Sequence, residues 1–396
     1  KSANCFPAKM SGFATERIPT AMSSKSSPTA TSRPLPIAAD GTSGDPLEFA
    51  NTPCVLIDLE VVRRNIVRTQ SVFDDLGVDF RPHIKTHRIP EFARMQIEAG
   101  ACGITCQKIG EAEVMAAAGI DDILITYNII GENKLARLAA LSKRCKLSVT
   151  VDNAMVAQGL SRTFSEQGGV LDVLVECDTG QGRCGVQSPE EALDLARTVV
   201  ASPGLQFGGL MTYPPMADMA AVDRWLIDAK RAVEAENIAC RRISNGGTPN
   251  LARVGAVTSA TEHRAGTYIY NDRSLMHAGA CDQSDCALTV IATVVSTPTP
   301  DRAIIDAGSK ALTSDLIGLS DYGLITQAPG ARIAALSEEH GHVDLATTEW
   351  RPAIGERIAI IPNHACVVSN LYDQVQVRHP SGKTAPMAVA ARGCSQ

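Results

Sequence analysis

A lysine between two histidines is the first feature of the chain that could do chemistry. Lys85 lies within residues 82–87, with His83 and His87 on either side. The apolar residues 78–80 before it predict a short buried strand, and Pro90 after it opens a helical pattern. An α/β barrel mounts catalytic groups at such strand ends, and a lysine in a buried setting can form a Schiff base. Lys85 and His87 are therefore candidate catalytic residues, although a surface loop is the simpler interpretation of this stretch alone.

The composition favours a folded protein that acts on small molecules. Of the 396 residues, 44% are hydrophobic and 20% charged, which is enough to bury a sizeable core. A net charge of −6 without any basic stretch argues against nucleic acid as a partner. No apolar run approaches the roughly 20 residues that span a bilayer. The 12 cysteines are scattered without a paired framework, so we expect a soluble, intracellular protein in a reducing compartment.

Residues 1–45 differ from the rest of the chain. They are rich in Ser, Thr, Ala and Pro, carry more basic than acidic residues and show no hydrophobic periodicity. This composition is typical of a transit segment for a plastid or mitochondrion, and equally of a disordered tail. The chain does not begin with Met, which suggests that the true start lies upstream. We exclude this segment from the fold and leave open whether it is cleaved.

Strands and helices alternate from residue 46 onward. A short strand at 55–57 and a helical pattern lead into eight further strand candidates. Their ranges are 78–84, 101–105, 122–126, 146–151, 171–178, 205–213, 240–245 and 262–270. Several are continuously apolar, as expected of parallel strands, and the Ser188-Pro189 start of one helix looks capped. The count of eight predicts a TIM-type (β/α)8 barrel over residues 46–275, with a doubly wound open sheet as the alternative.

The pattern changes after residue 275 to strands without helices between them. Strongly β-forming runs lie at 286–296, 302–306, 358–361, 372–377 and 387–391, with Pro and Gly between them. Residues 276–396 are therefore predicted to form a separate, mostly antiparallel β-domain.

Polar residues follow several barrel strands at their carboxyl ends, where barrels of this type have their site. The candidates for cofactor binding are Lys85, Arg183, Tyr213, Ser244, Gly246, Gly247, Thr248 and Tyr268. The Gly246-Gly247 turn would let the backbone approach an anion, and Ser244 and Thr248 add hydroxyl donors. With Lys85 across the mouth, this predicts pyridoxal phosphate, held by an imine and a phosphate cradle. Arg183 could hydrogen-bond the ring's phenolic oxygen, or form an ion pair with a carboxylate.

A second donor pair, His364 and Cys366, lies in the predicted β-domain. On a strand, residues two apart face the same side, so this pair would present an imidazole and a thiolate together. Two such ligands suit zinc, with water or substrate at the open positions. A packed histidine and a core cysteine is the simpler interpretation.

Together these stretches resemble the fold-type III pyridoxal-phosphate enzymes, which join an alanine-racemase-like barrel to a β-domain. Within them the chain is similar to the D-threonine aldolase and D-serine dehydratase group. The matching stretches are 82–87, 178–185, 244–248, 264–268, 271–272, 337–341 and 362–366, in the family's order. The resemblance implies that Lys85 is the Schiff-base lysine, that His364 and Cys366 bind a divalent metal (Mn, Mg or Zn), and that the protein is a homodimer.

The resemblance leaves two reactions open. A D-threonine aldolase would cleave D-threonine or D-allo-threonine to glycine and an aldehyde. A D-serine or 3-hydroxy-D-aspartate dehydratase would give a keto acid and ammonia, with Lys85 removing the Cα proton. The His-x-Cys pair resembles the dehydratases, whereas residues 285–310 look more like the aldolases, and we favour the aldolase.

Other roles stay open at this stage. His87 and His340 are candidate acid–base groups. A non-catalytic pyridoxal-phosphate carrier is disfavoured because such proteins lack the β-domain. A racemase has no use for a metal at a hydroxyl.

Overall fold

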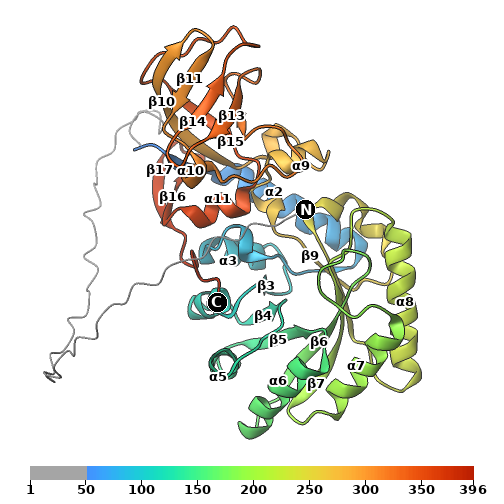
Figure 1. Cartoon of the computed structure of the whole chain (residues 1–396). Coiled ribbons are helices and arrows are strands. Elements are labelled where there is room, and N and C mark those ends of the chain that lie inside the picture. Colours follow the sequence, from blue (N-terminus) through green and yellow to red (C-terminus); the bar gives the residue numbers. More distant parts are fainter. Residues whose placement is uncertain (1–50) are drawn as a thin grey trace, which may run out of the picture. The chain divides into compact units, whose positions relative to one another are not determined.

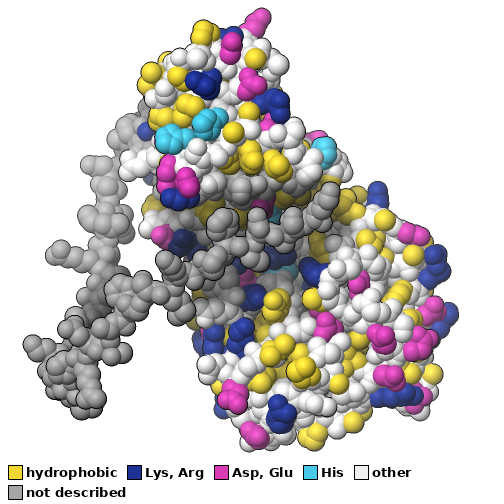
Figure 2. Space-filling view, in the orientation of Figure 1, with side chains coloured by type: hydrophobic (Ala, Val, Ile, Leu, Met, Phe, Trp, Pro, Cys, Tyr) yellow, Lys and Arg dark blue, Asp and Glu magenta, His cyan; other side chains and the backbone are white. Residues whose placement is uncertain are grey.

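The computed structural model describes residues 51–396, and the segment predicted to be transit-like or disordered lies outside the described residues. Two sheets and the helices around them make up the described part (Figure 1). No helix there is long and apolar enough to cross a membrane. On the face drawn in Figure 2, basic and acidic side chains are interspersed over the barrel surface rather than gathered into patches of one sign.

The first sheet has eight strands, all parallel. In sheet order they are β2 (Asp79–Phe80), β9 (Glu262–Arg264), β8 (Arg242–Gly246), β7 (Leu205–Thr212), β6 (Leu171–Cys177), β5 (Lys146–Val151), β4 (Asp122–Ile125) and β3 (Ile104–Cys106). A parallel bridge between His83 and Thr105 joins the two ends of this sheet, and the Thr105 N–H donates to the Pro82 carbonyl at 2.8 Å. The predicted barrel is confirmed and the open sheet is wrong.

Helices follow most of the barrel strands, as the alternating pattern predicted. The α-helices are α2 (Leu59–Leu76), α3 (Pro90–Glu98), α4 (Ile109–Ala117), α5 (Glu132–Leu141), α6 (Ala154–Glu166), α7 (Pro189–Ala201), α8 (Met219–Ala235), α9 (Arg273–His277), α10 (Ser309–Leu312) and α11 (Ala365–Leu371). The 3₁₀ helices are η1 (Ile84–Thr86), η2 (Thr248–Ala256), η3 (Thr267–Ile269) and η4 (Gln283–Asp285). Ser188 caps α7 by accepting the Glu191 N–H at 3.2 Å, so the predicted capped start is confirmed.

The second sheet has nine strands. It contains β1 (Cys54–Asp58), β10 (Leu288–Thr299), β11 (Arg302–Ile305), β12 (Leu324–Ile325), β13 (Arg332–Leu336), β14 (Gly341–Asp344), β15 (Arg357–Ile361), β16 (Gln374–Arg378) and β17 (Thr384–Ala388). Its pairs are antiparallel except β1 with β16. This confirms the predicted, mostly antiparallel β-domain. The strand predicted at 55–57 forms as β1, but it lies inside this sheet, between β10 and β16, although it precedes the barrel in sequence.

One apolar core joins the β-domain to the barrel. Phe73 of α2 stacks on Phe80 of β2, with ring centroids 4.5 Å apart, and the Phe80 ring meets the edge of Tyr268. The same cluster of buried side chains continues into Val290 and Ile360 of the second sheet. This shared packing fixes the β-domain against the barrel, which matters because the candidate site draws residues from both.

Candidate active site

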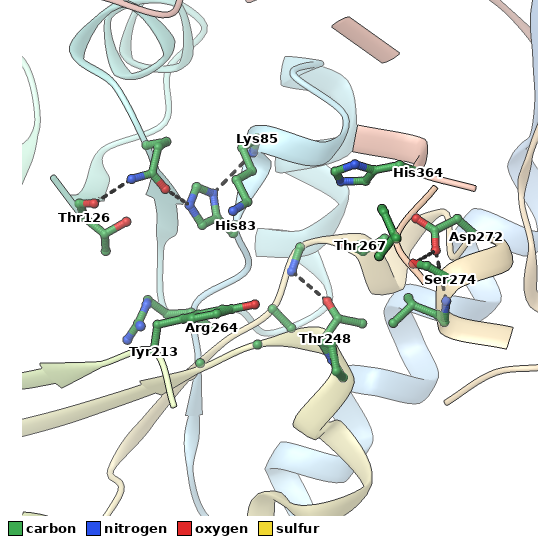
Figure 3. A pocket seen from close by; sticks show the side chains of 18 of the residues that line it. His83, Lys85, Thr126, Tyr213, Thr248, Arg264, Thr267, Asp272, Ser274 and His364 are labelled. Atoms are coloured by element: carbon green, nitrogen blue, oxygen red, sulfur yellow. Dashed lines mark hydrogen bonds between the residues drawn. The ribbon is translucent and has the colours of Figure 1, made fainter. Parts of the chain in front are cut away.

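Lys85 lies where the sequence placed it, directly after the first barrel strand. The strand β2 ends at Phe80, and the 3₁₀ helix η1, which contains Lys85, begins at Ile84. The Nδ1 atom of His83 accepts the Lys85 N–H at 3.3 Å, so the side chain of one residue fixes the backbone of the other. This places the Lys85 amine in a cavity at the carboxyl ends of the barrel strands (Figure 3).

The cavity has a volume of about 280 Å³, which suits a small molecule. The predicted site residues that line it are Lys85, Arg183, Tyr213, Gly246, Gly247, Thr248 and His364. In Figure 3, Lys85 lies beside His83 and above Tyr213 and Arg264, and His364, Asp272 and Ser274 lie across from them on the right. The structure thus brings together residues that are almost 280 positions apart, from the start of the barrel to the β-domain.

The turn after β8 has the geometry of an anion cradle. Gly247 has φ of +110°, a conformation that is strained for residues with a side chain, so glycine is favoured there. The Thr248 hydroxyl oxygen accepts the Gly266 N–H at 3.2 Å, which leaves the hydroxyl hydrogen to donate. Thr248 and Thr267 each begin a 3₁₀ helix, and first-turn N–H groups have no acceptor within the helix. The N–H groups of Gly246 and Gly247, which were predicted to face an anion, instead donate to the Asn245 side chain at 2.9 Å and to the Arg264 carbonyl at 2.7 Å. The donors that fit the phosphate of pyridoxal phosphate are therefore those of Thr248 and Thr267.

Ser244 was predicted to donate to the same phosphate, but it does not reach the cavity. Its hydroxyl donates to Glu262 Oε1 at 2.5 Å and accepts from Arg264 at 2.5 Å. Ser244 is fully buried because its side chain points from β8 into the barrel interior. It therefore supports Arg264 instead of a ligand.

Arg264 is a cavity residue that the predicted set omitted. Besides Ser244, its guanidinium donates to the Thr212 carbonyl at 2.7 Å, and both bonds hold it against the cavity. Burial lowers the pKa of Arg264 to about 10, so the group is still charged at neutral pH. Residues 264–268 are one of the stretches that carry the family resemblance. Arg264 is also the last residue of β9, and this position at a strand end could have identified it as a cavity residue.

Arg183 and Tyr213 face the cavity together. The Arg183 guanidinium lies over the Tyr213 ring, 4.8 Å from its centroid, a distance typical of a cation–π contact. It also approaches Glu176 at 3.8 Å, so the ion pair foreseen as the alternative is present as well. About half of the Arg183 side chain is exposed, which leaves it able to meet a ligand.

His83 lines the cavity as a neutral ring. Its Nε2 lies 3.2 Å from the Gln107 side-chain oxygen, and the Gln107 amide donates to the Thr126 carbonyl at 2.8 Å. This orientation places the hydrogen on Nε2 and leaves Nδ1 as the acceptor for Lys85 N–H. Burial, and then the charge of Lys85, hold the pKa of His83 well below its ordinary value. Gln107 and Thr126 follow β3 and β4, so strand ends were again the signal that could have found them.

The structure does not bring His87 to the cavity. The ring is fully buried beside Phe92, Nδ1 accepts the Ile89 N–H at 3.0 Å, and Nε2 lies 3.3 Å from the Gln96 side-chain oxygen. Burial lowers the pKa of His87 to about 4, so the ring is neutral. Both nitrogens are occupied, and this geometry opposes the proposed catalytic role.

Tyr268 belongs to the same buried group, and His340 lies elsewhere. The Tyr268 hydroxyl accepts from the Gln96 amide at 2.8 Å and does not line the cavity. The predicted contact of Tyr268 with a cofactor is therefore not made through this cavity. His340 is exposed in the turn between β13 and β14.

His364 and Cys366 begin a helix, so the predicted strand was wrong here. His364 is the N-cap of α11. The Ala365 N–H donates to Asp272 Oδ2 at 3.0 Å, and this contact from the end of the barrel fixes the start of the helix. A short apolar run such as residues 365–368 is compatible with a strand or with a helix. The contact that fixes the helix start comes from Asp272, which is far away in the sequence.

The two donors nevertheless lie next to each other. The Cys366 thiol is within hydrogen-bonding reach of the Thr86 and Thr267 hydroxyls, at 3.2 and 3.4 Å, and is hydrogen-bonded to His364. Burial lowers the pKa of His364, but the bond to Cys366 and its charge outweigh burial and raise it to about 9. Burial raises the pKa of Cys366, and His364 brings it below its ordinary value.

An imidazole nitrogen and a thiolate in contact fit a divalent cation such as zinc. Within residues 51–396 no third His, Cys, Asp or Glu completes a three-ligand group around them. The protein thus offers two ligands, and the remaining positions of a cation would be open to substrate or water.

The sequence matches two described families. Residues 57–274 match the family described as "Alanine racemase, N-terminal domain", and residues 287–378 match "Putative serine dehydratase domain". The chain is 36% identical over 369 residues to the D-threonine aldolase of Arthrobacter sp, covering 89% of this chain and 96% of that protein. The chain belongs to the fold-type III pyridoxal-phosphate enzymes of the D-threonine aldolase and D-serine dehydratase family.

Other members of this family agree in sequence and structure. The D-threo-3-hydroxyaspartate dehydratase of Delftia sp. (strain HT23) is 32% identical over 372 residues, covering 85% of this chain and 97% of that protein. A solved D-threonine aldolase from Filomicrobium marinum superposes with a TM-score of 0.81 at 31% identity, covering 88% of this chain and 97% of that one. A cysteine variant of the dehydratase, solved in the metal-free form, has a TM-score of 0.80 at 30% identity, covering 86% and 98%. The named relatives are lyases, so this chain is a member of a lyase family that uses pyridoxal phosphate.

Proposed function

We propose that this protein is a pyridoxal-phosphate- and divalent-metal-dependent D-threonine aldolase, which cleaves D-3-hydroxy amino acids to glycine and an aldehyde. The observation that carries the proposal is that Lys85 and His364, from the two ends of the chain, line one small cavity. The relatives of 36% and 31% identity that are named D-threonine aldolases support the choice of reaction.

The barrel side of the cavity is suited to hold the cofactor. The Lys85 amine would bind its aldehyde carbon, and the hydroxyl and backbone N–H of Thr248, with the Thr267 N–H, would bind its phosphate. Pyridoxal phosphate, when bound, supplies an electron sink for the pair released when a bond to Cα breaks. Arg264 and Tyr213 would lie against the ring, and the charge of Arg264 is retained at neutral pH.

The β-domain side of the cavity is suited to hold the hydroxyl of the substrate. His364 and Cys366 would hold a divalent cation, which supplies Lewis-acid polarisation of a hydroxyl oxygen. The β-hydroxyl of a D-3-hydroxy amino acid is the group that needs it, because cleavage of the Cα–Cβ bond requires loss of the hydroxyl proton.

The wall beside His364 favours an apolar β-substituent. Leu275 and Ile317 line the cavity, as does the carboxylate of Asp272. Arg273 does not line the cavity and is ion-paired with Asp321. A methyl group gains from burial against the two apolar side chains, whereas a second carboxylate would add negative charge beside Asp272. D-Threonine therefore fits better than 3-hydroxy-D-aspartate.

Product analysis tests the proposal directly. The purified protein, with pyridoxal phosphate, would be offered D-threonine, D-serine and D-threo-3-hydroxyaspartate, each with Mn²⁺ or Zn²⁺ and with a chelator. Glycine and acetaldehyde from D-threonine, lost with the chelator, is the expected result. Keto acid and ammonia as the main products would refute it.

A dehydratase is the second candidate, and one observation favours it. The donor pair is an imidazole and a thiolate, and the dehydratase relative was solved as a cysteine variant in a metal-free form. In this reaction Lys85, which the cavity places beside the cofactor site, would remove the Cα proton. The same incubations distinguish the two reactions, since only the dehydratase releases ammonia.

A further inference from the structure

The His364 ring is held from its outer side by a carboxylate. Asp315 Oδ2 lies 2.6 Å from His364 Nδ1, a length typical of a charge-assisted hydrogen bond. Asp315 does not line the cavity, so this contact is made behind the imidazole and not in the space for substrate. Nothing in the matched sequence stretches pointed to this residue.

The loop that carries Asp315 is fixed by the residue next to His364. The side-chain amide of Asn363 donates to the Asp315 carbonyl at 3.1 Å and to the Asp321 carbonyl at 2.6 Å. The Asp315 N–H donates to the Thr313 hydroxyl at 3.3 Å. The carboxylate and the imidazole are thus positioned by one set of contacts that ties residues 313–321 to residues 363–364.

The same loop has strained backbone on both sides of Asp315. Thr313 has φ of +65° and Ile317 has φ of +45°, in the left-handed region that β-branched residues avoid. Such conformations persist only where the surroundings impose them. Their presence on both sides of Asp315 indicates that packing contacts fix the path of this loop, in addition to its role as the connection from α10 to β12.

The contact determines which ring nitrogen is available. A carboxylate on Nδ1 keeps a hydrogen on that nitrogen, so Nε2 is the nitrogen left to bind elsewhere. His364 also interacts with Cys366, and because Nδ1 is taken by Asp315, Nε2 is the ring nitrogen left for a cation.

We propose that Asp315 is a positioning residue, which holds His364 with the hydrogen on Nδ1 and leaves Nε2 free, so that the imidazole is preorganised to bind a divalent cation together with Cys366. The inference rests on the proposed function, because it concerns the metal that this function requires. Carboxylates that hold a ligating histidine in this way raise metal affinity by about 10–100-fold.

The test is the affinity of the cofactor-loaded protein for Zn²⁺ and Mn²⁺, measured by competition with a chelator. Asp315→Ala is expected to weaken binding by about 10–100-fold. Asp315→Asn should lie between the two, because its amide oxygen still accepts from Nδ1–H but carries no charge. Asp301→Ala, at an exposed aspartate in the turn between β10 and β11, is the matched control and should bind within about twofold of the wild type.

Two further readouts separate positioning from a general structural role. With saturating metal, the rate of Asp315→Ala should recover to within about threefold of the wild type. Its melting temperature and cofactor absorbance should not change. Unchanged metal affinity in both Asp315 variants would overturn the inference while leaving the aldolase intact. A lower melting temperature of Asp315→Ala with unchanged metal affinity would overturn it too. If the wild-type protein does not bind either metal, both this inference and the metal in the proposed function are refuted.

Discussion

At the scale of single residues, the proposed reaction would depend on groups that a barrel and a β-domain bring to one cavity. Lys85 comes from the first barrel unit, and His364 from the helix that follows β15. Their roles follow from the cavity, which offers an anion cradle beside the lysine and a thiolate beside the histidine.

Replacement of the lysine tests the centre of this arrangement. Lys85→Ala should lower turnover by at least about a thousandfold, because both the attachment of the cofactor and a candidate base are removed. The absorbance of the lysine-bound cofactor should disappear, while the far-ultraviolet circular dichroism stays unchanged. Lys108→Ala is a control, since that amine lies over the Tyr127 ring outside the cavity, and it should keep at least half of the activity.

Replacement of the thiol tests the metal. Cys366→Asp changes a soft sulfur ligand into a hard oxygen ligand at the same position. We expect the affinity for Zn²⁺ to fall by about tenfold or more and the activation by Mn²⁺ to rise relative to Zn²⁺. Metal titrations of turnover and of direct binding measure this. An unchanged preference between the two metals would mean that Cys366 is not a ligand.

At the scale of elements, a network of buried ion pairs joins strands of the barrel. Glu262 at the start of β9 accepts from Arg81 at 2.7 Å and lies 3.5 Å from Arg242 at the start of β8. Arg81 also reaches Asp122 at the start of β4, at 2.6 Å. These contacts join β2, β9 and β8, at one end of the sheet order, to β4, near its other end. The network therefore helps to hold the barrel closed.

Glu262→Gln should destabilise the protein by about 3 kcal/mol, because it removes the buried charge between Arg81 and Arg242 and leaves each with one carboxylate, Asp122 or Asp172. Burial raises the pKa of Glu262, but Arg81 and Arg242 outweigh burial and lower it to about 2. Its contribution is therefore present above the unfolded pKa of about 4.5 and is lost as pH falls from there toward 2. Urea unfolding at pH 7 measures the first effect. Glu234→Gln, at a half-exposed position on α8, should change stability by less than about 0.5 kcal/mol.

At the scale of the whole molecule, buried neutral histidines couple stability to pH. Burial lowers the pKa of His87 to about 4 and that of His263 to about 3. Both rings pack in the core shared by the barrel and the β-domain, beside Phe92 and Phe73. The unfolded chain takes up these protons near pH 6.5, and the folded chain does not.

Stability should therefore fall as pH drops through 6.5, by about 2 kcal/mol per histidine at pH 5. Urea unfolding at pH 7 and pH 5 measures the loss. In His87→Gln the loss should be smaller by about 2 kcal/mol, and its rate at pH 7 should stay within about threefold of the wild type because the ring lies outside the cavity. A rate loss of a hundredfold with normal folding would restore His87 as a catalytic residue.

The homodimer that the family resemblance implies is also a property of the whole molecule, and it stays a prediction. Sedimentation of the full chain would measure it.

Much of the fold was determined by local sequence pattern. Eight apolar runs of strand length, each followed by a helix or turn, specify the barrel, and the structure has a strand within each predicted range or overlapping it. Gly247 with its positive φ, Pro90 at a helix start and the Ser188 cap are local devices that act within a few residues. For the same reason, Lys85 and the glycine turn could be placed from strand ends alone.

The remaining features depend on contacts between residues far apart in the chain, which no local pattern encodes. His87 looks like a site residue until Gln96 and Phe92 enclose it. The helix that carries Cys366 is set by Asp272, and β1 is drawn into the second sheet by β10 and β16. Sequence by itself thus determined which elements form and which residues stand at their ends. Only the tertiary structure decided which of those side chains face the cavity, because burial and hydrogen-bond partners belong to the packed chain.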